Sequence, residues 1–274
     1  MFTPRRLRRA WITSAVIFLI HGLVVSQWAA RIPAIQAKLN IGAGAFGTAL
    51  MAAAVGSICS IPLCGWLVTK FGSARITLLG GVGFCAALIP LALATNATLL
   101  AAALFLYGGT AGTMDVAMNV QAVEVERAMG TRVMSRFHAV FSVGGMAGAA
   151  FGGLVAARGV RAEIHLLTAA CVLTVLLAVS TSGMIPDHQS GDPAEPGHFS
   201  LRVPPALLAI SAIAFCILAS EGAVVDWSAL FLGRTLKADP GTAALGFSVF
   251  SGAMATVRFM GDWISHRVGS AKTV

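Results

Sequence analysis

Long apolar runs separated by polar segments dominate the hydrophobic pattern of this sequence. Eight of the runs reach the roughly 20 residues that a helix needs to cross the hydrocarbon core of a bilayer. They cover residues 11–30, 42–68, 74–94, 98–123, 137–157, 163–182, 205–232 and 241–265. Because lipid offers the backbone no hydrogen-bond partners, each run is predicted to be a helix. The pattern therefore predicts an all-α, multi-pass membrane protein with about eight transmembrane helices.

One polar segment is much longer than the others. Residues 183–204 are rich in proline, glycine and acidic residues and show no apolar periodicity, which is typical of a linker. By contrast, only Thr95 to Thr98 separate the third and fourth spans, which predicts a tight hairpin. We therefore expect an N-terminal six-helix half in residues 1–182, a linker, and the first two helices of an incomplete C-terminal half in residues 205–274.

The two parts of the chain share a short repeat. The second span ends with WLVTKFGSAR, from Trp66 to Arg75, and the eighth ends with WISHRVGSAK, from Trp263 to Lys272, 197 residues later. The same offset also aligns Leu39 with Leu236 and Gly44 with Gly241. A parallel repeat of this kind predicts two related bundles, each beginning with equivalent helices.

The composition and the placement of charge support a membrane setting. Hydrophobic residues make up 57% of the chain and charged residues 11%, which is more apolar surface than a soluble domain of this size can bury. The net charge of +8 does not point to nucleic acid, because the basic residues flank the apolar runs. With a cytoplasmic N-terminus, twelve Lys and Arg residues lie on the cytoplasmic side and six on the other. We therefore expect a protein of the cell inner membrane with its N-terminus and linker in the cytoplasm.

A loop motif follows the second span and partly recurs after the eighth. The first copy contains Gly65, Leu67, Lys70, Gly72 and Arg75, and the second contains Arg267, Gly269 and Lys272. Their spacing resembles the G-x-L-x-D-R-x-G-x-[RK]-[RK] loop of the major facilitator superfamily. The aspartate of that motif is replaced by Thr69 and by His266, and Asp262, one turn before His266, is a candidate substitute. The resemblance implies that both loops gate one face of a transporter.

The resemblance extends to the span count, the linker and the fifth span. Gly144, Gly148, Gly152 and Gly153 resemble the family's G-x-x-x-G-P-x-x-G-G element, with Ala149 in place of the proline. Such glycines make a smooth helix face for close helix contact. The resemblance implies a bundle of the major-facilitator type with twelve helices, so this chain is expected to be C-terminally truncated. GTMDVAMNVQAVEVE and SRFHAVFSVGGMAG are similar to bacterial permeases distantly related to the fucose permease group.

Ionisable residues inside the spans are the main functional candidates, because a charge at bilayer depth is costly unless it is paired or hydrated. Asp115 and Asn119 share one face of the fourth span and could bind solute or protons; the alternative is an interhelical hydrogen bond. Glu221 and Asp226 lie about 140° apart around the seventh span and should face different neighbours. Arg258 could pair with Glu221 and couple protons, or pair locally with Asp262.

The first span carries a further polar face near its outer end. Gln27 and Arg31 could line a cavity and bind an anionic or hydroxylated solute. The alternative for Arg31 is a snorkelling contact with lipid headgroups, and Trp28 is expected in the interfacial aromatic belt.

No motif supports enzyme chemistry, a nucleotide or metal cofactor, or a cofactor of any other kind. The predicted function is a monomeric secondary active transporter that moves a small polar solute by alternating access with proton coupling. Its partners would be the lipid bilayer, the solute and protons, with no nucleic acid. The alternatives are a non-transporting membrane scaffold or sensor, or an inactive fragment of a transporter. Gating is assigned to Gly65, Lys70, Gly72, Arg75, Asp262, Arg267 and Gly269.

Overall fold

A computed structural model describes residues 2–187 and 204–268 of the chain. Within these residues the structure contains eight helical segments that are long and apolar enough to cross a membrane, as predicted. The helices are α1 (Pro4–Leu39), α2 (Ala43–Phe71), α3 (Ser73–Ala86), α4 (Leu88–Leu93), α5 (Ala97–Met129), α6 (Met134–Ala157), α7 (Ala162–Ser180), α8 (Pro205–Arg234) and α9 (Pro240–Val268). The short α3 and α4 form one span, and a 3-10 turn, Thr181–Gly183, extends α7.

Several helices extend beyond the apolar runs because local capping lengthens them. Thr3 caps α1 by accepting the Arg6 backbone N–H, and Pro4 provides a favourable first helical residue. Asn96 accepts the Leu99 N–H and starts α5 three residues after α4 ends, which confirms the predicted tight hairpin. At the other end of the chain, α9 continues to Val268. Arg267, predicted in a gating loop, therefore lies in a helix.

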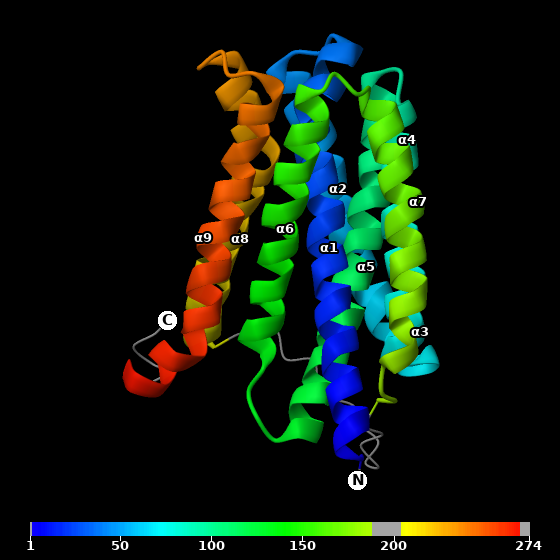
Figure 1. Cartoon of the computed structure of the whole chain (residues 1–274), viewed down its shortest axis with the longest axis vertical. Helices are drawn as coiled ribbons and strands as arrows, with labels where there is room; N and C mark the ends of the chain where they lie inside the picture. The colour runs from blue at the N-terminus through cyan, green and yellow to red at the C-terminus, as the bar shows by residue number, and fades with distance from the viewer. Residues whose placement is uncertain (1, 188–203, 269–274) are drawn as a thin grey trace.

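The helices form an upright bundle with α1 near its centre (Figure 1). α6 packs against α1 on one side and against α9 on the other, and α5 packs against α2 and α3. α8 lies beside α9 at one edge of the bundle, while α7 covers α3 and α4 at the opposite edge. Many large apolar side chains on the outer helix faces are exposed, among them Phe215, Leu218 and Val249. This surface fits the lipid environment expected from the composition.

The helix boundaries repeat along the chain. α2 begins at Ala43 and α9 begins at Pro240, so the two starts are separated by the same 197 residues (240 minus 43) as the sequence repeat. Gly44 and Gly241 occupy the second position of their helices. The shared offset supports the equivalence of α2 and α9.

Glycines bring α1 and α6 into backbone contact, as the small-residue pattern predicted. A Cβ atom at Gly144 would overlap the Leu19 carbonyl oxygen, and one at Gly22 would overlap the Phe141 carbonyl oxygen. On the side of α6 that faces α9, a Cβ at Gly153 would lie 2.9 Å from the Ala244 Cβ. Only hydrogen fits at these positions, so α6 can pack closely between its two neighbours.

Replacing Gly144 by alanine is expected to lower the free energy of unfolding by about 1–3 kcal/mol, because backbone rather than a flexible side chain blocks the added methyl group. Gly44→Ala is the matched control, since no atom lies within 4 Å of a Cβ at that position. Both variants can be compared by denaturation in detergent micelles. Equal stability of the two variants would contradict the close approach of α1 and α6.

Candidate functional site

An ion pair joins α8 and α9 inside the membrane-spanning region. The Arg258 Nη2 donates to the Glu221 Oε1 at 2.8 Å, and the Arg258 Nη1 donates to the Ser142 Oγ of α6 at 2.7 Å. Both charged side chains are 22% exposed. Of the two partners considered for Arg258 from the sequence, the structure pairs it with Glu221. The side chain of Asp262, the other candidate, lies outside the described residues.

Aromatic and apolar residues surround this pair. A cavity of about 50 Å³ adjoins Glu221 and Arg258, and its apolar walls are Val25, Phe141, Val225, Phe247, Phe250 and Met254. A space of this size suits one or two water molecules. His138 of α6 interacts electrostatically with Arg258 and with Asp115 of α5. Titratable groups from α5, α6, α8 and α9 therefore lie within electrostatic reach of one another.

Asp115 and Asn119 contact each other along α5. The Asn119 Nδ2 donates to the Asp115 backbone oxygen at 2.9 Å and to its Oδ1 at 3.2 Å. Both side chains are half-buried, and these contacts stay within one helix instead of linking two. Farther along α5, Glu126 accepts the N–H groups of Val133 and Met134 at 2.8 and 3.0 Å. That carboxylate holds the turn into α6.

Asp226 faces a different neighbour from Glu221, as predicted from their angular separation. Glu221 points to Arg258 on α9, whereas Asp226 interacts electrostatically with Tyr107 on α5. The Tyr107 hydroxyl is buried and has no hydrogen-bond partner among the described residues. The two acidic side chains of α8 therefore belong to separate surroundings.

A buried polar chain links α1, α6 and α7. The Arg31 Nε donates to the His165 Nδ1 at 2.7 Å, and the His165 Nε2 lies 2.7 Å from the Gln27 Oε1. The Gln27 Nε2 in turn donates to the backbone oxygens of Leu23, at 3.2 Å, and Gly148, at 3.4 Å. The predicted pair Gln27 and Arg31 is thus brought together, but through a histidine that the sequence did not single out. A lone histidine in an apolar run gave no signal of this role.

The outer-face predictions for two α1 residues are wrong. Arg31 is only 3% exposed, so it does not reach out to the lipid headgroups as the snorkelling alternative required. Trp28 is 2% exposed and packs against Tyr107 with ring centroids 6.3 Å apart, so it is a core residue rather than part of an interfacial belt. Both errors have one cause: the top of α1 is covered by neighbouring helices.

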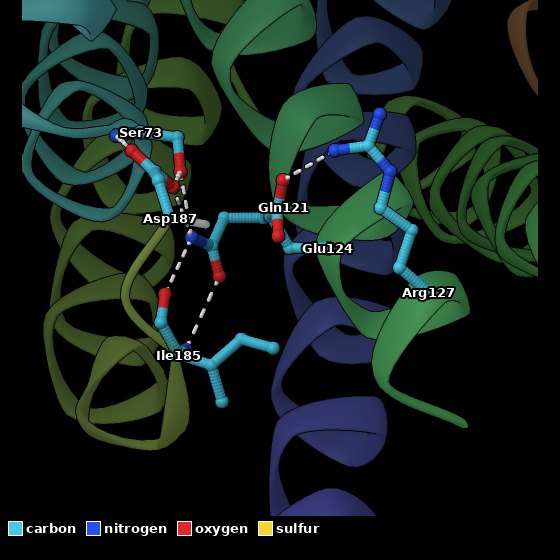
Figure 2. A network of polar contacts seen from close by, with 6 residues as sticks. All are labelled: Ser73, Gln121, Glu124, Arg127, Ile185 and Asp187. Carbon is cyan, nitrogen blue, oxygen red and sulfur yellow. Dashed lines mark hydrogen bonds and ion pairs between the residues drawn. The ribbon is translucent and has the colours of Figure 1, made fainter. Parts of the chain in front are cut away.

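The start of α3 is fastened by Asp187, a residue that follows the sixth span. The Ser73 N–H donates to the Asp187 Oδ2 at 2.6 Å, and the Ser73 hydroxyl donates to the Asp187 Oδ1. The Gln121 Nε2 donates to the Ser73 Oγ at 2.6 Å and to the Ile185 backbone oxygen at 2.8 Å (Figure 2). We call Ser73, Gln121, Ile185 and Asp187 the linker clamp. It ties the beginning of the predicted linker to the start of α3 and to α5.

Of the residues in the first predicted gating segment, Gly72 lies beside the linker clamp, whereas Gly65, Lys70 and Arg75 point elsewhere. Gly72 has a φ of 84°, which favours glycine, and a Cβ there would lie 3.4 Å from the Asp187 Oδ2. Lys70 instead turns outward over the Trp66 ring, 4.8 Å from its centroid. Gly65 faces open space, and Arg75 is exposed.

A carboxylate from elsewhere in the chain binds the start of α3, next to the loop motif that carries Thr69 in place of its aspartate. Thr69 bonds its own helix, with its hydroxyl donating to the Trp66 oxygen at 2.8 Å. Asp187 supplies a carboxylate at the N-terminus of α3, where free N–H groups favour negative charge. In the second copy of the motif, Gly269 lies outside the described residues.

Comparisons with known proteins agree with this arrangement. The model of the Major Facilitator Superfamily matches residues 11–274. The uncharacterised transporter y4wD of Sinorhizobium fredii is 35% identical over 272 residues, which cover 97% of this chain and 71% of that protein. An uncharacterised MFS-type transporter of Yersinia pestis is 32% identical, with 96% of this chain and 68% of the relative covered. The crystal structure of a D323A mutant of the nucleoside transporter NupG aligns with a TM-score of 0.64 at 13% identity, covering 95% of this chain and 69% of that one.

Proposed function

Because the chain belongs to the Major Facilitator Superfamily and is a multi-pass membrane transporter, we propose that it moves a small polar solute by alternating access, coupled to protons. The proposed setting is the bacterial inner membrane with the N-terminus in the cytoplasm, which the distribution of basic residues favours. The single observation that carries the coupling is the half-buried ion pair between Glu221 and Arg258.

This pair has the chemistry of a proton-controlled link between helices. While Glu221 is ionised, its charge balances Arg258 and holds α8 to α9. A proton on Glu221 removes that balance and leaves Arg258 bonded to Ser142 of α6. The contact between α8 and α9 thus weakens when a proton binds, while the contact between α6 and α9 persists. Proton binding would therefore favour a different packing of α8.

Solute binding is assigned to Asp115 and Asn119 of α5, together with Asp226 of α8. Asp115 lies within electrostatic reach of His138, which also interacts with Arg258. A solute that contacts Asp115 would change the field at the ion pair, and a protonated pair would change the field at Asp115. This reciprocity is the energetic basis of coupling. In the proposed transport cycle, the chain's two halves rock about these groups and the loop from Gly65 to Arg75 gates one face.

The coupling can be tested in proteoliposomes loaded with the pH-sensitive dye pyranine. A panel of organic acids, sugars and nucleosides is added outside, and at least one solute is expected to acidify the lumen. The double variant D115N/E221Q should abolish this acidification, because it removes the carboxylate proposed to bind the solute and the one proposed to bind the proton.

Asp239→Asn is the matched control for loss of a carboxylate. Asp239 lies in the turn between α8 and α9, where the Thr242 hydroxyl and N–H hold the pKa of its carboxyl below the usual range. Asparagine can cap α9 in the same way, so this variant should transport normally. Solute-driven acidification that survives in D115N/E221Q would overturn the proposed coupling.

A further inference from the structure

A cavity of about 460 Å³ opens at the end of the bundle opposite the N-terminus. It lies between the upper part of α1, the turn from α6 to α7 and the turn from α8 to α9. Three arginines line it, namely Arg31, Arg161 and Arg234. In the described part of the chain, no acidic residue is among its lining residues. The remaining walls are small or apolar, so the cavity is a strongly positive space of the size that small ligands occupy.

Arg31 is the residue of this cavity whose side chain is held in a fixed position. Its side chain is buried, and its Nη2 has no hydrogen-bond partner among the described residues. Its Nε donates to the His165 Nδ1, so that nitrogen carries no proton and the proton of the ring lies on Nε2. This Nε2 donates to the Gln27 Oε1. The guanidinium is therefore held in position by a neutral imidazole, and its charge is left unbalanced.

The acidic residue that follows the lining residues Arg161 and Ala162 in sequence is already engaged. Glu163 lies 3.0 Å from the Lys38 Nζ and 3.5 Å from the Arg161 Nε. Within residues 2–187 and 204–268, no carboxylate forms an ion pair with Arg31. A buried, unpaired guanidinium is costly and presents unused donors in a fixed plane.

We propose that this cavity binds a small anion through Arg31, namely the carboxylate or phosphate group of the transported solute. The inference deepens the proposed function and rests on it for the identification of the anion as solute. Carboxylates and phosphates match the planar donor fork of arginine. Arg161 and Arg234, both exposed at the rim, attract the anion from solution, and Arg31 binds it.

Binding can be measured without any transport. The purified protein in an uncharged detergent is titrated with inorganic phosphate and with succinate, against sodium chloride at equal ionic strength, and its melting temperature is followed. At least one of the two anions is expected to raise the melting temperature in a saturable manner. Arg31→Gln should weaken this binding at least tenfold, about the loss of one strong charged contact.

The matched control is Arg158→Gln, which removes an exposed arginine from the same turn that does not line the cavity. Its binding should equal that of the unchanged protein. Without added anion, Arg31→Gln should melt no lower than the unchanged protein, because it removes an unbalanced buried charge. If Arg31 served only to support the packing, this variant would melt lower and the anions would have no specific effect; that result overturns the proposal.

A second variant tests the role of the guanidinium group, and a measurement in lipid nanodiscs tests whether the anion is a lipid headgroup. Arg31→Lys keeps the charge but loses the fork, so it should bind the anion more weakly than arginine and more tightly than glutamine. Nanodiscs of phosphatidylcholine with and without phosphatidylglycerol test a lipid headgroup as the source of the anion. Stabilisation by phosphatidylglycerol alone, with neither soluble anion effective, would overturn the solute assignment.

The outcomes also separate this proposal from proton coupling. If the unchanged protein bound neither anion but still showed solute-driven acidification, only the anion site would be overturned. Saturable anion binding that requires Arg31, with no acidification by any solute, would overturn the coupling and leave an anion site in place.

Discussion

Glu221→Gln is expected to lower the free energy of unfolding by about 3 kcal/mol and to abolish proton-coupled transport. The substitution leaves the Arg258 guanidinium in the bundle without its carboxylate partner at 2.8 Å. Removing one member of a buried ion pair costs more than the pair itself contributes, because an uncompensated charge remains. Denaturation by SDS in mixed micelles measures the stability, and the pyranine assay measures coupling.

The double variant E221Q/R258Q tests whether this cost arises from the pair. The two neutral side chains leave no unbalanced charge, so the double variant should be clearly more stable than either single variant. Coupling should stay absent in E221Q and in the double variant, because neither retains a carboxylate that can exchange a proton at this position. Additive losses of stability in the double variant would show that Glu221 and Arg258 contribute independently, and would contradict the pairing.

The parts of this molecule that depend on local chemistry were predictable. Apolar length defined the eight spans, since a helix must match the bilayer whatever its neighbours are. The glycines of the fifth span predicted close helix contact, because a residue without a side chain, such as Gly144, lets a neighbouring helix backbone approach. The sequence predicted two alternative partners for Arg258. The choice of Glu221 depends on how α8 is rotated relative to α9, which the sequence does not give.

The parts that depend on the arrangement of distant helices were not predictable in the same way. Burial of Trp28 and Arg31 requires knowing that α5, α6 and α7 surround the upper part of α1. The role of His165 requires a contact with residues of the first helix more than 130 positions away. Asp187 lay in a polar segment without periodicity, where nothing marked one carboxylate as structural.

Gln121→Leu is expected to destabilise the protein by about 3 kcal/mol through loss of the linker clamp. The amide is 1% exposed, donates to the Ser73 Oγ and the Ile185 oxygen, and accepts the Ile185 N–H at 3.3 Å (Figure 2). Leucine fills a similar volume but leaves the Ile185 N–H and oxygen without partners, at about 1–3 kcal/mol for each, while the Ser73 hydroxyl keeps only Asp187. Stability is measured by SDS denaturation, and hydrogen–deuterium exchange at the Ile185 amide reports on the clamp directly.

Gln36→Leu is the matched control, because Gln36 is another buried glutamine whose side chain, unlike that of Gln121, makes no hydrogen bond to the described residues. Gln36 is 0% exposed, and neither side-chain polar atom has a hydrogen-bond partner among the described residues. The same substitution there removes an unsatisfied amide, so stability should be unchanged or higher. Equal losses in both variants would mean that any buried glutamine on these helices matters equally, and would refute the clamp. A loss confined to Gln121→Leu, with faster exchange at Ile185, would instead show that α3 and α5 hold the chain that leaves the sixth span.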